Sequence, residues 1–471
     1  MDRIASVLAL FLVPAFAAAA DQDWATYRGN PQRTANTDGV PGPSAPKVLW
    51  SVKSQEHFIA SPLPLGERVL FSSLGAFNVP TMRAFAVDPI AQRVAWTKSA
   101  PYLKLPTVST PAVADGKLIF GDGMHQTDGA ILHCLRADKG QAFWQLAVPG
   151  TLVHLEGSPT VVEGKVYLGG GDAGVICVDL NRLTLDGKEQ PAAAIQKLLD
   201  AKWSELQAIY EKEKKEKPEF AVPPREDQLP KPAPVKLWEQ GKGKWHVDAP
   251  VAVADGLVLV ASAFLDKEMV GDRALFALDA KTGAIKWRAP LKINPWSGPS
   301  VLGKTVVVCG STVNFDPTKL KGAKGDVAAY DLATGQEKWR KEIATGGVLS
   351  CAALTPDMAV VTATDGKVRG FNLADGERRW IYDAKTPFFA PVALSKDTAY
   401  AGDLKGAIHA INLADGTAKW TLDLGTEPSV LSPGMIYGGP VLHGGRLFVA
   451  TCNLEGAFAR QPTVVACIGD K

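Results

Sequence analysis

Alternating apolar and polar positions recur along the chain in short runs, and many of these runs end at a tryptophan. In ALFALDAKTGAIKW the run ends at Trp287, with Gly283 four residues earlier and Asp279 eight residues earlier. Alternation with a period of two predicts β-strands. An Asp-x-x-x-Gly segment between two such strands predicts a hairpin, because glycine accepts the positive φ and aspartate bonds the turn backbone.

The same frame returns several times and predicts a repeat protein. A second strand pair precedes each hairpin, for example in residues 249–263 and 158–170. Four antiparallel strands per repeat form one blade of a β-propeller. We therefore predict an all-β fold, an eight-bladed β-propeller over residues 46–471, with a tryptophan wedged between neighbouring blades at each repeat. The tryptophans in this frame are Trp50, Trp96, Trp144, Trp238, Trp287, Trp339, Trp380 and Trp420.

The two ends of the chain predict how the ring closes. Residues 462–471 form a strand that stops before any tryptophan partner, whereas Trp50 lies in a strand that precedes the first complete blade. The N-terminal strand is therefore expected to complete the last blade, so that no sheet edge is left open.

One spacing in the repeat is far too long for a single blade. Between Trp144 and Trp238 the chain carries an insertion of about residues 184–235, within blade 3. Its apolar residues recur at helical spacing, which predicts a helix. A helix packed on the propeller flank is the simpler interpretation, and a helix that binds a partner is the alternative. The apolar residues are Ile195, Leu198, Leu199, Trp203, Leu206, Ile209 and Tyr210.

Residues 1–20 are typical of a secretory signal peptide. Arg3 precedes a short apolar stretch, and an alanine run ends at Ala20, near the expected cleavage point. The stretch is too short to span a membrane, and no later segment is apolar enough to do so. No cysteine follows the cleavage point to carry a lipid. We therefore expect a periplasmic or secreted protein in which residues 21–45 form a lead-in to the propeller.

Composition excludes some classes of protein. Of 471 residues, 46% are hydrophobic, and 51 Lys and Arg balance 49 Asp and Glu. These values fit a globular chain and lack the basic excess of a dedicated nucleic-acid binder. We expect no nucleic-acid partner, and we expect a monomer.

The cysteines leave several pairings open. Export makes disulfides possible, and six cysteines allow fifteen complete pairings. Cys134 and Cys177 occupy an apolar slot of the repeat, where buried free thiols are favoured over a bridge. No Cys-x-x-Cys is present, so neither a c-type haem nor a zinc knuckle is predicted. The six are Cys134, Cys177, Cys309, Cys351, Cys452 and Cys467.

The repeat motif and the segment WATYRGNPQRTA (24–35) resemble those of PQQ-like β-propellers over nearly the whole mature chain. This resemblance implies two kinds of function. One branch comprises quinoprotein dehydrogenases, which bind pyrroloquinoline quinone and calcium in the central funnel. The other comprises outer-membrane assembly proteins of the B-subunit type, which are eight-bladed binding scaffolds without a cofactor.

The sequence departs from both branches. It lacks the adjacent cysteine pair that typically covers the quinone in quinoprotein alcohol dehydrogenases, and the lipid-bearing cysteine of the assembly scaffold. It also contains no His-Glu-x-x-His, nucleophile elbow or P-loop, so no catalytic residue is assigned. We expect a non-enzymatic envelope protein that binds protein or peptide partners, with a quinoprotein oxidoreductase as the alternative.

Propeller topology places two kinds of segment on one face, which we call the link face. They are the links between blades and the middle loops, which join the second and third strands of a blade. His125, His154 and His246 come from blades 2, 3 and 4, and with Glu156 and Asp248 they are candidates to bind a metal or an anionic ligand. The alternative is that these residues pack the channel rim. The candidates are His125 in a middle loop and His57, His154, Glu156, Trp245, His246, Asp248 and Trp296 in links.

Overall fold

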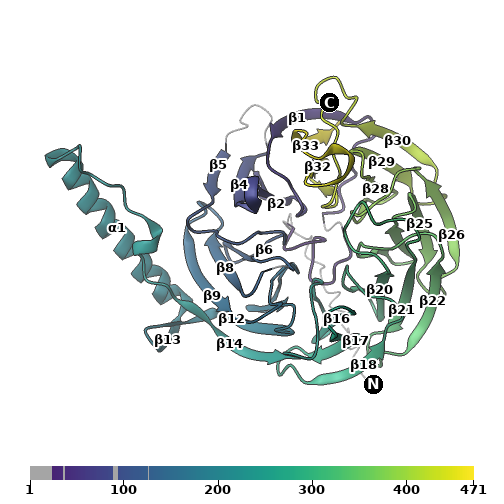
Figure 1. The fold of residues 1–471 in the computed structure, drawn as a ribbon, viewed down its shortest axis with the longest axis horizontal. Coiled ribbons are helices and arrows are strands. Elements are labelled where there is room, and N and C mark those ends of the chain that lie inside the picture. Colours follow the sequence, from purple (N-terminus) through teal and green to yellow (C-terminus); the bar gives the residue numbers. More distant parts are fainter. Residues whose placement is uncertain (1–23, 36–37, 88–93, 126, 471) are drawn as a thin grey trace, which may run out of the picture.

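In a computed structural model that describes residues 24–35, 38–87, 94–125 and 127–470, the chain forms a closed ring of eight antiparallel β-sheets (Figure 1). The eight-bladed propeller predicted from the repeats is confirmed. Seven sheets have four strands, and the sheet of blade 3 gains a fifth, β13 (Lys188–Pro191), inside the insertion.

Each blade runs from a short inner strand beside the axis to an outer strand at the rim. Blade 1 consists of β2 (Leu63–Leu65), β3 (Arg68–Leu74), β4 (Pro80–Ala86) and β5 (Val94–Lys98), and blade 2 of β6 (Ala112–Ala114), β7 (Lys117–Gly121), β8 (Ala130–Arg136) and β9 (Ala142–Val148). Blade 3 consists of β10 (Thr160–Val162), β11 (Lys165–Gly169), β12 (Val175–Leu185) and β14 (Ala233–Gln240), and blade 4 of β15 (Ala252–Ala254), β16 (Leu257–Leu265), β17 (Val270–Asp279) and β18 (Ile285–Pro290).

The other half of the ring repeats this order. Blade 5 consists of β19 (Ser300–Leu302), β20 (Thr305–Ser311), β21 (Gly325–Asp331) and β22 (Glu337–Ile343), and blade 6 of β23 (Ala353–Thr355), β24 (Met358–Thr362), β25 (Lys367–Asn372) and β26 (Arg378–Asp383). Blade 7 consists of β27 (Ala393–Leu394), β28 (Thr398–Gly402), β29 (Ala407–Asn412) and β30 (Ala418–Asp423), and blade 8 of β31 (Val441–His443), β32 (Arg446–Ala450), β33 (Thr463–Gly469) and β1 (Lys47–Ser54).

The N-terminal strand closes the ring, as the two chain ends predicted. Strand β1 is the outer strand of blade 8 and pairs antiparallel with β33, from Lys47 opposite Gly469 to Ser54 opposite Thr463. Because this pairing joins the first and last strands of the chain, the eighth sheet has the same number of strands as its neighbours.

The repeated tryptophans tie each blade to the next. Six of the indole N–H groups donate to a backbone carbonyl of the following blade and that of Trp420 donates to Pro43 of the lead-in, all at 2.8–3.3 Å. In five blades the turn glycine lies directly against the ring of the preceding blade's tryptophan: a Cβ added at Gly335 would stand 2.5 Å from Trp287. Gly335 also has φ +71°, so both the turn and the packing require glycine here.

Trp144 departs from this pattern because the insertion replaces the turn that it would meet. Its indole nitrogen is buried and has no hydrogen-bond partner among the described residues. Its ring instead packs in an apolar cluster with Leu183 and with Ile195 and Leu199 of α1 (Ala192–Glu216). The predicted helix is therefore present, and its first turns pack on the flank of the propeller.

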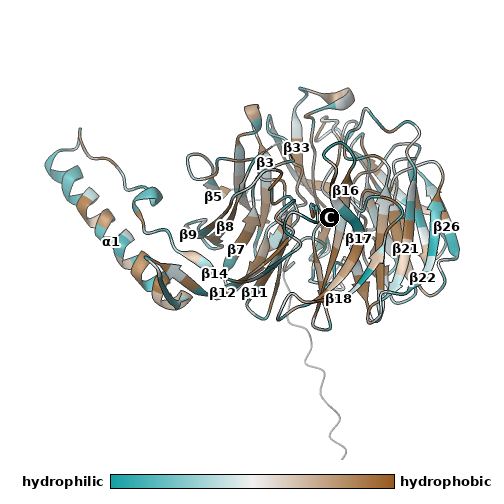
Figure 2. Ribbon diagram, turned by 60° about the horizontal axis from the view of Figure 1, so that its bottom comes forward, coloured by the Kyte–Doolittle hydropathy of each residue, from teal (hydrophilic) through white to brown (hydrophobic). Residues whose placement is uncertain are grey.

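Most of α1 extends away from the disc. Figures 1 and 2 both show the helix projecting from the rim beside blades 2 and 3, and the colours of Figure 2 show mostly hydrophilic residues toward its far end. Its buried residues are Ala192, Ile195 and Leu199, all in the first half of the helix. A 25-residue helix is about 37 Å long, so the insertion forms an arm rather than a covering layer.

The lead-in enters the centre of the ring. Backbone carbonyls of residues 25–34 accept hydrogen bonds from the inner strands of blades 2, 4, 5 and 6, at Val113, Val253, Val301 and Leu354. The guanidinium of buried Arg33 donates to the backbone oxygens of Ser158 and Val251 and to the Thr160 hydroxyl. The segment therefore fills the space between the inner strands.

Two further sequence predictions have different outcomes. All six cysteines are buried and unpaired, as was favoured for Cys134 and Cys177. The predicted signal peptide, residues 1–20, lies outside the described residues. In the part of the chain that the structure covers, no helix combines the length and apolarity that a membrane span needs.

Candidate functional site

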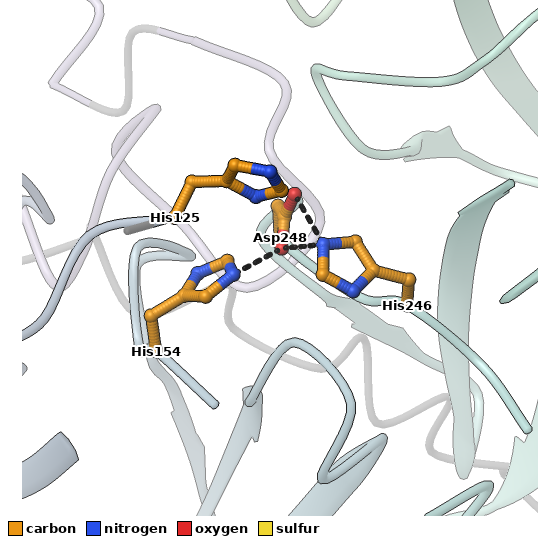
Figure 3. Close-up of side chains that lie close together, drawn as sticks. All are labelled: His125, His154, His246 and Asp248. Carbon is orange, nitrogen blue, oxygen red and sulfur yellow. Dashed lines mark hydrogen bonds and ion pairs between the residues drawn. The ribbon is translucent and has the colours of Figure 1, made fainter. Parts of the chain in front are cut away.

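Three neighbouring blades bring their polar loop residues together on the link face. His125 lies in the middle loop of blade 2, His154 in the link from β9 to β10, and His246 and Asp248 in the link from β14 to β15. Figure 3 shows the three imidazoles pointing toward one another around the Asp248 carboxylate. We call these four residues the histidine cluster.

The distances within the histidine cluster are short. One potential ligand atom from each of the four side chains lies within 4.8 Å of the other three. The ring centroids are 5.5 Å apart for His125 and His154, 5.7 Å for His125 and His246, and 5.3 Å for His154 and His246. His154 and His246 are completely buried, whereas His125 is exposed. The cluster therefore has a rigid floor and one ligand at the surface.

Carboxylates hold the imidazoles from behind. His246 places Nε2 at 3.0 Å from Asp248 and Nδ1 at 2.6 Å from Asp172, which lies in the middle loop of blade 3. Glu156 lies 3.5 Å from Nδ1 of His154, and it also accepts a hydrogen bond from the backbone N–H of His125. Each buried histidine thus has one nitrogen facing the cluster and the other facing a carboxylate.

Backbone geometry makes room for these rings. A Cβ added at Gly171 would stand 3.1 Å from Nε2 of His154, and one at Gly271 would stand 3.2 Å from Cβ of His246. Both glycines have positive φ, +57° and +104°. Gly171 also exchanges two backbone hydrogen bonds with Val247, which joins the middle loop of blade 3 to the link that carries His246.

His154 is the least satisfied member of the cluster. Both of its ring nitrogens are buried, and neither has a hydrogen-bond partner in the described residues. The nearest carboxylate oxygens, from Glu156 and Asp248, are each 3.5 Å away. Buried polar atoms are normally paired, so the two nitrogens of this imidazole are available to bind a ligand. Oδ1 of Asp248 lies 3.0 Å from Nε2 of His246 and 3.5 Å from Nε2 of His154, between the two buried imidazoles.

Burial and neighbouring charges shift the pKa values of these groups in opposite directions. Burial lowers the pKa of His154, against the pull of Asp248. Burial would also lower the pKa of His246, but its hydrogen bonds with Asp248 and Asp172 outweigh this effect and raise the pKa to about 9. Burial and repulsion from Asp248 raise the pKa of Glu156 to about 8. Burial opposes ionisation of Asp248, but the hydrogen bond with His246 lowers its pKa overall.

Three of the sequence candidates lie away from the histidine cluster. His57 pairs its backbone with Leu74, and its Nδ1 accepts from the backbone of Asn453. Trp245 stacks on Phe276, 4.0 Å between centroids, inside an apolar cluster. Trp296 donates from its indole to the carbonyl of Ser311. In the described part of the chain, the side chains of these three residues make their hydrogen bonds and ring contacts outside the cluster.

Sequence reasoning did not assign Asp172 to the site. It occupies the middle loop of blade 3, one blade along from the loop that carries His125. The equivalence of those two loops was the available signal, since both lie on the link face. The Asp172 carboxylate fixes the orientation of His246 through Nδ1, a contact that can be recognised only when the two loops are brought together.

The link face over blades 5 to 8 has a different character. Its links and middle loops form an apolar cluster that we call the apolar cap. Phe389 is buried and meets the rings of Phe315 and Tyr437 edge to face, at 5.7 and 5.1 Å. The cap consists of buried Leu349, Phe389, Leu404 and Met435, with Trp296, Leu320, Tyr437 and Phe458 packed against them.

The middle loop of blade 5 reaches across to blade 8. A Cβ added at Gly456, in the middle loop of blade 8, would stand 3.5 Å from Cγ of Pro317 and 3.3 Å from Sδ of Met435. Blades 6 and 7 separate these two blades in the ring. The apolar cap therefore covers this half of the channel mouth, whereas His125 is exposed on the other half.

The fold is shared with solved structures of different function. BamB from Moraxella catarrhalis aligns with a TM-score of 0.57 at 15% identity, over 90% of this chain and 98% of that one. A europium-containing methanol dehydrogenase aligns with a TM-score of 0.60 at 15% identity, over 96% and 98%. At these identities the alignments establish the propeller fold alone.

Two curated relatives match shorter segments. Outer membrane protein assembly factor BamB from Nitrosomonas eutropha is 33% identical over 116 residues, which is 25% of this chain and 25% of the relative. Quinohemoprotein alcohol dehydrogenase ADH IIB from Pseudomonas putida is 33% identical over 107 residues, 22% of this chain and 15% of the relative. The matches thus span a quarter or less of each curated relative.

A family model covers far more of the sequence. The model PQQ_2, described as outer membrane protein assembly factor BamB, matches residues 42–214, 235–317 and 316–465. The gap between the first two segments falls at the end of the helical insertion. These segments include most of the propeller. The chain therefore belongs to the PQQ_2 family of β-propellers, whose model is described as outer membrane protein assembly factor BamB.

Proposed function

We propose that this protein is an exported scaffold of the cell envelope that binds protein partners and has no catalytic role of its own. The observation that carries the proposal is membership of the BamB family along nearly the whole ring. The signal-peptide pattern of residues 1–20 adds a periplasmic or secreted location. The protein would act as a monomer whose blades present loops and strand edges to its partners.

The filled centre of the ring supports binding at the outer surfaces. A small ligand usually occupies a concave pocket, and in a propeller the central channel is the natural one. Here the lead-in takes that place at the level of the inner strands, where Arg33 makes hydrogen bonds to blades 3 and 4. A ligand at this level would have to displace a buried guanidinium and its partners, at a cost of several kcal/mol.

The arm supplies a surface suited to a protein partner. Beyond α1 the chain returns through residues 217–232, and there Phe220 and Val222 are 73% and 69% exposed. Large apolar side chains at the tip of a projecting arm are typical of an interaction surface, because a monomer gains nothing from exposing them. The arm deepens the scaffold proposal by naming where a partner would dock.

Site-specific photo-crosslinking in the native envelope tests this function. A photoreactive residue is placed at Phe220 and, as the matched control, at Ile381, an exposed apolar residue of the outer strand β26. We expect a discrete crosslinked protein from Phe220 and none from Ile381. Equal labelling at both positions, or no adduct from the arm, would contradict partner binding through the arm.

The quinoprotein alternative has a specific basis in the match to the quinohemoprotein alcohol dehydrogenase. The described residues do not fit pyrroloquinoline quinone with calcium in the central funnel. The lead-in fills the inner-strand level, and the apolar cap covers the mouth over blades 5 to 8. All six cysteines are single buried thiols. Saturating quinone and calcium should therefore leave Tm unchanged and support no dye reduction, and a positive response in both assays would favour the alternative.

A further inference from the structure

We propose that His125, His154, His246 and Asp248 form a binding site for a divalent transition-metal ion of the zinc class. The site is independent of the scaffold function. Three imidazoles and one carboxylate converge from three different blades.

The donor set selects the class of metal. Zn²⁺ prefers histidine nitrogen, accepts carboxylate oxygen and commonly takes four ligands in a tetrahedron. Ca²⁺ and Mg²⁺ require mostly oxygen ligands, six or more of them for Ca²⁺. Because three of the four donors here are imidazoles, the geometry excludes a hard-cation site and favours Zn²⁺, with Cu²⁺ and Ni²⁺ as ions of the same ligand preference.

The spacing suits a tetrahedral ion. Zinc–ligand bonds of about 2.0–2.1 Å place neighbouring ligand atoms about 3.3 Å apart. The Asp248 carboxylate is 3.0 Å from Nε2 of His246 and 3.5 Å from Nε2 of His154, which brackets that value. The carboxylate is therefore already at ligand spacing from both buried imidazoles. The four ligand atoms lie within 4.8 Å of one another, so any pair still wider than about 3.3 Å must close by side-chain movement, and exposed His125 is the least constrained of the four.

Two independent features indicate a missing cation. His154 is completely buried, yet neither of its nitrogens has a hydrogen-bond partner in the described residues, and Nε2 points toward the cluster (Figure 3). The second feature is charge. Asp172, Glu156 and Asp248 surround the imidazoles, and in the described chain their ion-pair partners are His154 and His246, with no lysine or arginine among them.

Carboxylates behind the buried ligands complete the arrangement. Metal-binding histidines commonly direct their second nitrogen to a carboxylate, which fixes the ring and strengthens the ligand. Asp172 occupies this position for His246, at 2.6 Å from Nδ1, and Glu156 lies 3.5 Å from Nδ1 of His154. Both are positioning residues. The bound ion would connect the middle loop of blade 2 to the links of blades 3 and 4.

Direct metal binding tests the site. The mature chain is purified without a polyhistidine tag, stripped with a chelator and titrated with Zn²⁺ by calorimetry, with bound metal counted by mass spectrometry. We expect one Zn²⁺ per chain and no binding of Ca²⁺. Co²⁺ bound in place of Zn²⁺ should show the visible absorption of a tetrahedral complex.

The variants separate ligand loss from misfolding. His125→Ala removes an exposed loop side chain, so it should fold normally and weaken Zn²⁺ binding about 100-fold or more. Asp172→Asn should weaken it about 10–100-fold, as loss of an outer partner does. His443→Ala, at the end of β31 and outside the cluster, should bind as the wild type does. Absence of Zn²⁺ binding in the wild type, or unchanged affinity in His125→Ala, would overturn the proposal.

Discussion

The two halves of the link face are built from the same elements and carry opposite chemistry. Over blades 2 to 4, links and middle loops present the histidine cluster with its supporting carboxylates. Over blades 5 to 8, the equivalent segments form the apolar cap, with Phe389 at its centre. The strands beneath both halves follow one repeat, with the tryptophan in every blade and the turn glycine in blades 2, 4, 5, 6 and 7.

The repeat therefore specifies the strands and turns of the scaffold, whereas the residues of the link face can differ from blade to blade. The apolar cap gains stability by burying side chains across blades that are not adjacent, since Leu320 of blade 5 and Phe458 of blade 8 pack against the same buried residues. The histidine cluster gains little in this way, because burial of imidazoles and carboxylates costs free energy unless each is paired. The cap is thus expected to contribute stability, and the cluster to contribute binding.

The largest predicted effect lies in the apolar cap. Phe389→Ala should lower the free energy of unfolding by about 3–5 kcal/mol, because it leaves a cavity beneath two aromatic neighbours. Phe315→Ala is the matched control, since Phe315 is 41% exposed and its loss should cost about 1 kcal/mol. Denaturant titration measures both, and equal costs would break the view that the cap is a packed core.

In the lead-in, substitutions of two buried arginines should differ in their effect on the free energy of unfolding, by less than the substitutions in the apolar cap. Arg33→Met leaves the carbonyls of Ser158 and Val251 without a donor, so it should cost about 2–4 kcal/mol. Arg28→Met should be neutral or stabilising, because Arg28 donates to Val392 while its Nε and second terminal nitrogen are buried without a partner in the described residues. Denaturant midpoints compare the two, and a larger loss for Arg28→Met would contradict this assignment.

Zn²⁺ should stabilise the protein by binding to the histidine cluster. At a hundredfold excess over Kd, binding adds about 2.7 kcal/mol, which for a chain of 471 residues raises Tm by about 2–3 °C. The rise should persist in Phe315→Ala and disappear in His125→Ala. Differential scanning calorimetry with and without Zn²⁺ measures it, and an equal rise in His125→Ala would place the ion elsewhere.

The smallest effect concerns the metal-free cluster. His246→Leu leaves the carboxylates of Asp172 and Asp248 without their shared partner, so it should cost about 1–3 kcal/mol in chelator. His246→Gln keeps a hydrogen-bond donor near one carboxylate and should cost about half as much. If His246→Leu were as stable as the wild type, the histidine would have no pairing role in the absence of metal.

The fold could be predicted from the sequence because its determinants are local and repeated. The turn glycine and the tryptophan four residues later lie in one hairpin, and in five blades the glycine packs on the preceding blade's tryptophan, as Gly335 does on Trp287. Closure of the ring was predicted because each end of the chain carries a strand without a complete blade, and β1 pairs with β33 as expected. The long spacing before Trp238 revealed the insertion. The sequence did not show that the arm projects from the disc, because this depends on which apolar residues of the helix pack against the propeller, and only Ala192, Ile195 and Leu199 are buried.

The histidine cluster was predictable in part. Topology assigned His125, His154 and His246 to one face on neighbouring blades, because links and middle loops share that face. Topology alone could not distinguish these positions from His57 or Trp296, which occupy equivalent links and make structural contacts instead. Asp172 escaped notice because its contact with His246 joins residues far apart in sequence.

The most direct test of the account is anomalous diffraction at the zinc absorption edge from crystals of the mature chain grown with one equivalent of Zn²⁺. The account predicts one strong peak bonded to His125, His154, His246 and Asp248, at about 2.0–2.2 Å from each ligand atom. A structure in which the ion lies elsewhere, or in which the cluster remains without a peak while the four side chains keep their places, would contradict it.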